Sequence, residues 1–201
     1  SEMSTSSTTY PNVLALDYLR ATKKNVPEVE AKARQFIHLG YQRLVSFEVS
    51  GGGFDWFGRP PANIVLTAYG LMEFEDMARV HDVDAALIDR TRAWLLAKRE
   101  QNGTWEADAH MLNDGLAGSV HRGGDLTLAT TAYVAWSVFG SGKSTDQAAV
   151  TLDWLLSHEP TTIDNAHTRA LVCNAVHAMQ PDKSAPYMRR RVERARRSEA
   201  G

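Results

Sequence analysis

The stretch LTLATTAYVAWSVF, residues Leu126–Phe139, is apolar throughout its length. A helix of this composition has almost no polar face, so it must be covered by protein on most sides. PANIVLTAYGLMEFEDMARV, residues 61–80, is a stretch of the same kind, and residues 163–179 are largely apolar as well. Strand signals are absent and helical periodicity recurs along the chain, which predicts buried helices at these three places.

Helices with one wet face are expected between the buried ones, over residues 27–49, 82–103 and 144–159. In the first of them Val29, Phe36 and Ile37 belong to the apolar face, which repeats at i, i+4, i+7 and i+8. In the second, Arg92 is expected on the charged face. The first helix of the chain, residues 11–23, is expected to be mostly buried.

This alternation of buried and one-sided helices is what an α/α toroid requires, because inner helices touch both the axis and the outer layer. We count about four inner–outer hairpins. The chain also repeats itself, because GGFDWFGRPPANIVLTAYGL resembles NGTWEADAH followed by LTLATTAYVAW, each with a glycine-aromatic turn, a polar loop and Thr-Ala-Tyr in an apolar helix. Such self-similarity is typical of stacked helical units. The prediction is an all-α chain folded as an incomplete α/α toroid of helical hairpins, with a site in the long polar loops at one end.

The composition argues against several kinds of partner. The chain has 201 residues and a net charge of −2, which gives no bulk attraction to nucleic acid. Its arginine-rich end, residues 189–197, lacks the interleaved aromatic residues that stack on bases, so we expect the wet face of a helix and no nucleic-acid site. No apolar run reaches the roughly 18–20 residues that a membrane span needs.

We expect no cofactor and no metal. SVFGSGKST departs from a phosphate-binding Walker loop, because Ser137 stands where the first glycine is required. The histidines lack the His-x-x-x-His spacing that places two ligands on one helical face. Cys173 lies among apolar residues at helical spacing, where a buried and unreactive thiol is expected. Asp82 or Asp84 is expected to cap the helix that follows.

Several long motifs occur in a fixed order: YPNVLALDYLRATKKNVPEVEAKARQFIHLGYQRLVSF, GGGFDWFGR, NIVLTAYGL, REQNGTW, LTLATTAYV and DNAHTRALVCNAV. Together they cover nearly the whole chain. They resemble the thioester domain of the alpha-2-macroglobulin and complement family, and look closest to the bacterial alpha-macroglobulins. The resemblance implies that residues 11–201 form a thioester-type domain of a larger protein.

In that family a Cys-x-Glu-Gln motif lies immediately before this region, and its cysteine and glutamine join as an internal thioester. Counting back from Pro11, the four positions fall on residues 1–4, where neither the cysteine nor the glutamine stands. Either the sequence begins just after the motif or this protein has lost it. Residues 1–10 are accordingly expected to be an N-terminal tail, and this stretch alone cannot form the bond.

The resemblance also implies candidate site residues. Asn113 occupies the position at which some members carry the histidine that takes the acyl group and passes it to hydroxyls. A carboxamide can neither act as that nucleophile nor shuttle a proton near neutral pH, so direct reaction with amines is implied. His110, three residues away, is a weak substitute. An apolar collar that keeps water from the thioester is expected from Trp56, Phe57, Trp105 and Met111, although tight aromatic packing without any reactive role explains them equally well.

The function implied by the resemblance is a broad-spectrum protease inhibitor, not an enzyme, that traps target proteases covalently through the full-length protein. It would act in the periplasm, at the cell surface or outside the cell. The fragment is expected to self-associate if the toroid is open, because uncovered apolar flanks would be larger than monomers usually tolerate. Two alternatives stay open: a toroid enzyme, such as a lyase, glycosidase or terpenoid cyclase, that uses Glu106, Asp108 and Asp114, and a thioester-free binding domain.

Overall fold

The computed structural model describes residues 2–22, 26–108 and 126–188, and within them it contains helices and loops but no named β-strand. In that part of the chain, strand-like pairing is limited to isolated bridges from Phe54 to Glu48 and to Asn63. The all-α prediction is confirmed. The chain divides into two compact units, Ser1–Leu95 and Leu96–Gly201.

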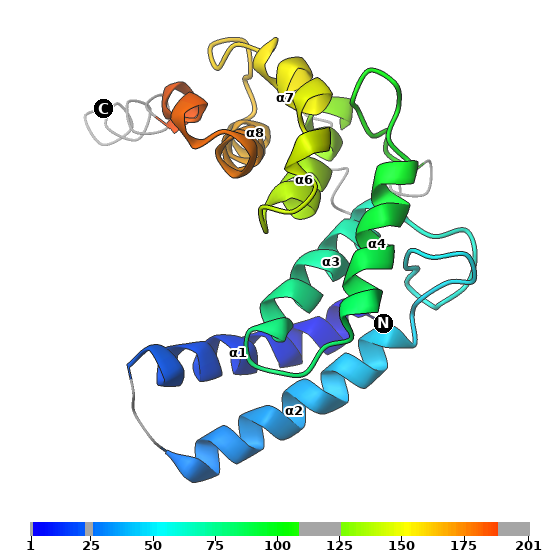
Figure 1. Cartoon of the computed structure of the whole chain (residues 1–201), viewed down its shortest axis with the longest axis vertical. Coiled ribbons are helices and arrows are strands. Elements are labelled where there is room, and N and C mark those ends of the chain that lie inside the picture. Colours follow the sequence, from blue (N-terminus) through cyan, green and yellow to red (C-terminus); the bar gives the residue numbers. More distant parts are fainter. Residues whose placement is uncertain (1, 23–25, 109–125, 189–201) are drawn as a thin grey trace. The chain divides into compact units, whose positions relative to one another are not determined.

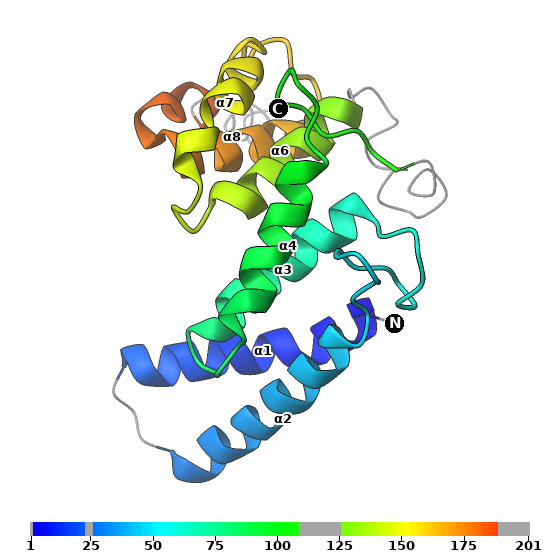
Figure 2. The same cartoon turned by 45° about the vertical axis from the view of Figure 1, so that its right-hand side comes forward.

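The first unit contains α1 (Glu2–Ala21), α2 (Pro27–Val45), α3 (Ile64–Ala78) and most of α4 (Ala85–Ala97). The helices α1 and α2 pack side by side as an antiparallel hairpin (Figure 1 and Figure 2). The two helices come close together at Gly40, where an added Cβ would lie 2.0 Å from the hydroxyl oxygen of the buried Thr9. Only glycine fits at this position of α2.

The helix α3 is the buried helix of this unit, as predicted. Asn63 caps its N-terminus, because the side-chain oxygen accepts a hydrogen bond from the backbone N–H of Leu66 at 2.8 Å. Apolar side chains from successive turns of α3 are fully buried: Ala68, Leu71, Phe74 and Met77. The helix α4 buries one side, so it belongs to the one-sided class that the sequence predicts.

The second unit is built around α6 (Leu126–Phe139) and α8 (Ala166–Met179), which pack against each other. Almost every residue of the last three turns of α6 is buried, and this helix has the predicted bounds. The short helix α7 (Ala149–Leu156) lies between the 3-10 turn η2 (Thr145–Gln147) and α8. Asn165 caps α8 by accepting from the backbone N–H groups of His167 and Thr168. The turn η3 (Pro181–Lys183) follows α8.

Two expectations about the first hairpin are wrong. The helix α1 begins at Glu2, not at residue 11, so residues 2–10 belong to this helix although Pro11 lies inside it and removes one backbone hydrogen bond. It is also not mostly buried, because Leu14 and Tyr18 are 52% and 57% exposed. In α2 the exposed Phe36 and Val29 depart from the predicted apolar face. These side chains were predicted to be buried because they are apolar. In each helix of the hairpin, however, the buried face is narrower than the arc over which the apolar residues are spread.

The structure also corrects the expectation for Arg92. Its side chain is buried, and its guanidinium donates to the carboxylate of Glu75 on α3. A further carboxylate oxygen, from Asp89 one turn earlier on α4, lies 3.6 Å from the guanidinium. Arg92 was predicted on the solvent-exposed face because arginine is charged. The carboxylate of Glu75 on the facing helix allows the arginine to be buried.

Candidate functional site

A long segment, residues 46–63, joins α2 to α3 and carries two of the predicted collar residues. Phe54 anchors it, because its side chain is fully buried and its ring lies 5.4 Å from the ring of Phe74 on α3. The backbone N–H of Phe54 donates to the hydroxyl of Thr67 at 2.8 Å, and that hydroxyl donates to the carbonyl of Asn63 at 2.6 Å. The middle of this segment is therefore fixed to the buried helix. We call residues 46–63 the Phe57 segment.

The tip of the Phe57 segment is a tight turn. One carboxylate oxygen of Asp55 accepts from the backbone N–H groups of Phe57 and Arg59, at 3.0 and 3.2 Å. Gly58 adopts a φ of +69°, and a Cβ there would lie 2.9 Å from the carbonyl oxygen of Ser46. These contacts hold the phenyl ring of Phe57 at the surface, where the residue is 77% exposed. An exposed aromatic ring on an ordered turn is available to cover a neighbouring group.

The segment before α6 also contains a glycine turn, which precedes Trp105. Gly103 has a φ of +88°, and a Cβ on it would meet backbone atoms of Val150 and Thr151 at 2.8 Å. The hydroxyl of Thr151 donates to the Gly103 carbonyl at 2.7 Å. Trp105 follows, fully buried, with the Arg99 guanidinium 5.8 Å from the centre of its ring. This aromatic residue belongs to the core of the second unit.

Both segments use the same contact between an aromatic backbone and a threonine. The N–H of Phe54 donates to Thr67, and the N–H of Trp105 donates to the hydroxyl of Thr131 at 3.0 Å. Thr67 and Thr131 are the threonines of the two Thr-Ala-Tyr triplets. The internal repeat read from the sequence is thus a repeated structural unit, and it pairs Trp105 with Phe54.

Titratable groups with shifted pKa values lie at packing positions. Burial lowers the pKa of His81, helped by the nearby His38, whose ring centre is 5.4 Å away. Burial also raises the pKa of Tyr187, whose hydroxyl donates to the backbone carbonyl of His158 at 2.9 Å. Cys173 is half-buried, not buried as expected, and its sulfur lies 3.8 Å from the carbonyl oxygen of Ser184. None of these arrangements joins a nucleophile to an exposed base.

The acids of the alternative enzyme hypothesis are not brought together as a described pair. Glu106 is exposed and accepts a hydrogen bond from the hydroxyl of Thr127 at 2.8 Å, Asp108 is half-buried, and Asp114 lies outside the described residues. Asp84 caps α4 through the N–H of Ala86 at 2.9 Å. Over the described ranges, no group of three or more His, Cys, Asp or Glu side chains could hold a metal ion. The helices of those ranges include none with the length and hydropathy of a membrane span.

A comparison with known families identifies the domain. The family described as A-macroglobulin TED domain matches residues 2–200, which is almost the entire chain. The chain belongs to this family. The resemblance read from the ordered motifs is confirmed.

Relatives of the TED domain include much longer proteins. Thioester-containing protein 1 allele S3 of Anopheles gambiae is 24% identical over 170 residues, which are 83% of this chain and 12% of that protein. Ovostatin of Gallus gallus is 25% identical over 169 residues, which are 82% of this chain and 11% of that protein. The TED domain therefore corresponds to a small part of the length of these relatives.

In this TED domain, the predicted site residues have different surroundings. Trp56 is half-buried beside the exposed Phe57 on one turn, whereas Trp105 is buried in the second unit. His110, Met111 and Asn113 lie outside the described residues. The sequence reasoning missed the threonines that hold both aromatic segments, although the repeated Thr-Ala-Tyr triplet was a signal for them. It also missed the ion pair between Glu48 of the Phe57 segment and Arg90 of α4, because these residues are 42 positions apart and no periodic pattern links them.

Proposed function

We propose that this TED domain belongs to a bacterial alpha-macroglobulin, a protease inhibitor that traps its targets covalently and does not turn over a substrate. The observation that carries the proposal is the family match over residues 2–200. A relative named as a thioester-containing protein supports a thioester in the whole protein. The site of action proposed for the whole protein is the periplasm, the cell surface or the space outside the cell.

The proposed reaction is the transfer of a glutamyl group to an amine. A lysine amine of the trapped protease attacks the carbonyl carbon of the thioester, the C–S bond breaks, and an amide forms. The cysteine leaves as a thiolate, which makes the thioester a good acylating agent, and the proton lost by the amine balances its charge. Each event therefore yields one amide and one free cysteine thiol, and the thioester is consumed and not re-formed.

Exposed aromatic side chains support the proposal that the thioester is shielded from water before activation. Phe57 is exposed on an ordered turn with Trp56 beside it, and a dry site slows hydrolysis. Trp105 and Met111 stay part of the proposed collar. For Trp105, burial in the core favours the packing role over direct contact with the bond. The exposed Leu14, Tyr18 and other apolar side chains of the first hairpin support the predicted self-association.

The proposal is tested with the whole protein and methylamine. We expect incorporation of one methylamine per chain with the release of one thiol, measured with radiolabelled amine and a thiol reagent. A sample pretreated with methylamine should then lose covalent attachment to an added protease. If neither label nor thiol appears, the covalent trap is wrong and a thioester-free binding domain takes its place.

Asn113 provides a second test. Replacing Asn113 with histidine is expected to shift acyl transfer from amines towards hydroxyl acceptors, because an imidazole can accept the acyl group and move a proton near neutral pH. The measurement is the ratio of labelled glycerol to labelled methylamine bound after activation. We expect this ratio to rise about 10-fold or more, which is below the roughly 100-fold lower end of general acid–base effects. An Asn113→Gln variant is the control. An unchanged ratio in the histidine variant would remove Asn113 from the mechanism.

A further inference from the structure

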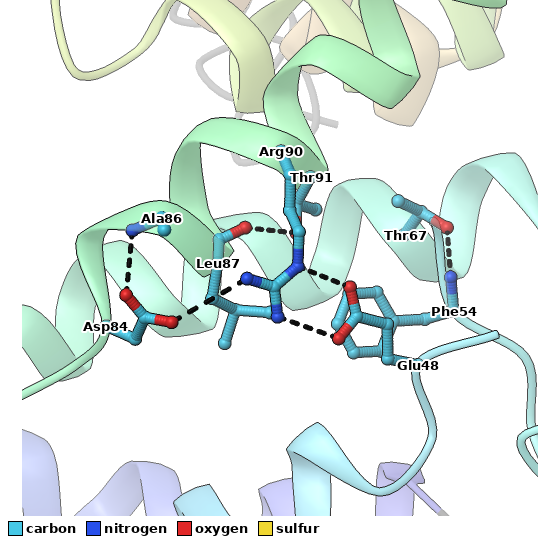
Figure 3. A network of polar contacts seen from close by, with 8 residues as sticks. All are labelled: Glu48, Phe54, Thr67, Asp84, Ala86, Leu87, Arg90 and Thr91. Atoms are coloured by element: carbon cyan, nitrogen blue, oxygen red, sulfur yellow. Dashed lines mark hydrogen bonds and ion pairs between the residues drawn. The ribbon is translucent and has the colours of Figure 1, made fainter. Parts of the chain in front are cut away.

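The Phe57 segment is attached to α4 by a paired ion contact. Arg90 of α4 donates to both carboxylate oxygens of Glu48, from Nε at 2.6 Å and from Nη2 at 2.8 Å (Figure 3). Glu48 lies three residues after the end of α2, near the start of the segment. A two-point pairing between guanidinium and carboxylate restricts both side chains in orientation as well as distance. This contact fixes where the segment leaves α2.

A second carboxylate holds Arg90 from the other side. Asp84 lies 3.6 Å from Nη1 of Arg90, and Figure 3 shows the guanidinium between the two acids. Asp84 is itself fixed, because its carboxylate accepts from the N–H of Ala86 and its own N–H donates to the hydroxyl of Tyr41 at 3.1 Å. The hydrogen bonds to Glu48 raise the pKa of Arg90 above its ordinary value, so the cation persists. The arrangement is therefore ordered before any partner binds.

The same face of α4 contacts the segment a second time. Trp94 lies one helical turn after Arg90, and residues at this spacing share a face. A Cβ on Gly52 or on Gly53 would lie 2.9 or 2.8 Å from the Trp94 indole, so the backbone of the segment rests on this ring. Glu48, Gly52 and Gly53 are thus all held by α4, and the tip that bears Phe57 follows directly.

We propose that Arg90 is a positioning residue that, through Glu48, holds the exposed ring of Phe57 where it shields the reactive bond. This inference rests on the proposed function. Phe57 is 77% exposed and its backbone N–H is held by Asp55 of the same segment, so the position of its ring depends on how the segment is held. An isolated surface ion pair contributes little, but a two-point arginine–carboxylate contact within a network is the recognised exception. Loss of Arg90 should loosen the segment and leave the helices in place.

The first experiment measures the segment itself by hydrogen exchange in the 201-residue chain. In Arg90→Gln, exchange at the hydrogen-bonded amides of Val49, Gly52 and Phe54 is expected to rise about 3–10-fold, because local opening becomes easier. Arg90→Lys retains the charge but not the two-point contact, so it should give an intermediate increase. Arg43→Gln, an exposed cation near the end of α2, is the matched control. Unchanged exchange in Arg90→Gln would overturn the inference.

The second experiment measures shielding in the whole protein, as the rate at which a thiol appears without protease. Arg90→Gln is expected to release thiol about 3–10-fold faster than the wild type, in proportion to the exchange result. Phe57→Ala should accelerate release as well, and the double variant should not exceed the faster single variant, because both act through one ring. Faster exchange without faster release would overturn the inference alone. A wild-type protein with no thiol to release would instead remove the proposed function, and the inference with it.

Discussion

Replacing Arg92 with alanine is expected to lower the free energy of unfolding by about 3–5 kcal/mol. The Arg92 side chain is only 4% exposed, and its guanidinium is ion-paired with Glu75, which is 19% exposed at the side chain. The truncation leaves the Glu75 carboxylate in a poorly solvated place without this cation, and the penalty for such a charge exceeds the net value of the pair. The measurement is urea unfolding followed by circular dichroism.

Two further variants distinguish two causes of the destabilisation: the loss of the cation beside Glu75 and the loss of packing by the Arg92 stem. Arg92→Met retains most of the apolar stem and should still be destabilising, whereas the double variant Arg92→Met with Glu75→Leu should recover much of the loss, because a buried ion pair can be replaced by apolar groups. Arg43→Ala, at an exposed site on α2, should change stability by no more than about 0.5 kcal/mol. Equal losses in Arg92→Ala and Arg43→Ala would show that the buried pair does not stabilise the first unit.

The buried helices were the predictable part of the fold. α6 begins and ends where its apolar run does, and α3 lies within the second such run, because a helix without a polar face has few alternatives to burial. Arg92 and α1 mark the limit of this reasoning. Whether a charged residue is buried depends on what the facing helix presents, here Glu75, and whether Leu14 is covered depends on neighbours that local periodicity does not identify.

The candidate site was predictable only in part. The glycines and Asp55 in the Phe57 segment indicate a turn, and the turn is there with Phe57 exposed on it. The sequence grouped Trp105 with Trp56 and Phe57 because all are aromatic residues in polar loops. The repeat contained a better correspondence, since the position before each Thr-Ala-Tyr helix that matches Trp105 is Phe54, and both residues are fully buried. The ion pair of Glu48 with Arg90 joins residues far apart in sequence, so spacing gave no signal for it.

Replacing Trp105 with alanine is expected to lower the free energy of unfolding by about 3–5 kcal/mol, the range for truncating a large buried aromatic residue. The ring has no exposed surface, so its removal leaves a cavity under Arg99 and beside the turn at Gly103. The backbone hydrogen bond from Trp105 to Thr131 survives the change, so the loss reports on the side chain. Denaturant unfolding of the second unit measures it.

Trp136→Ala is the matched control, because Trp136 is a half-buried tryptophan on α6 in the same unit and should cost less. Trp105→Phe keeps part of the buried ring and should also cost less than the alanine variant. A Trp105→Ala chain that unfolds at the same denaturant concentration as Trp136→Ala would contradict the core assignment. That outcome would favour the collar role that the sequence suggested for Trp105. A tryptophan that contributes little to stability, on a segment that bears the site, would be explained by shielding of the reactive bond.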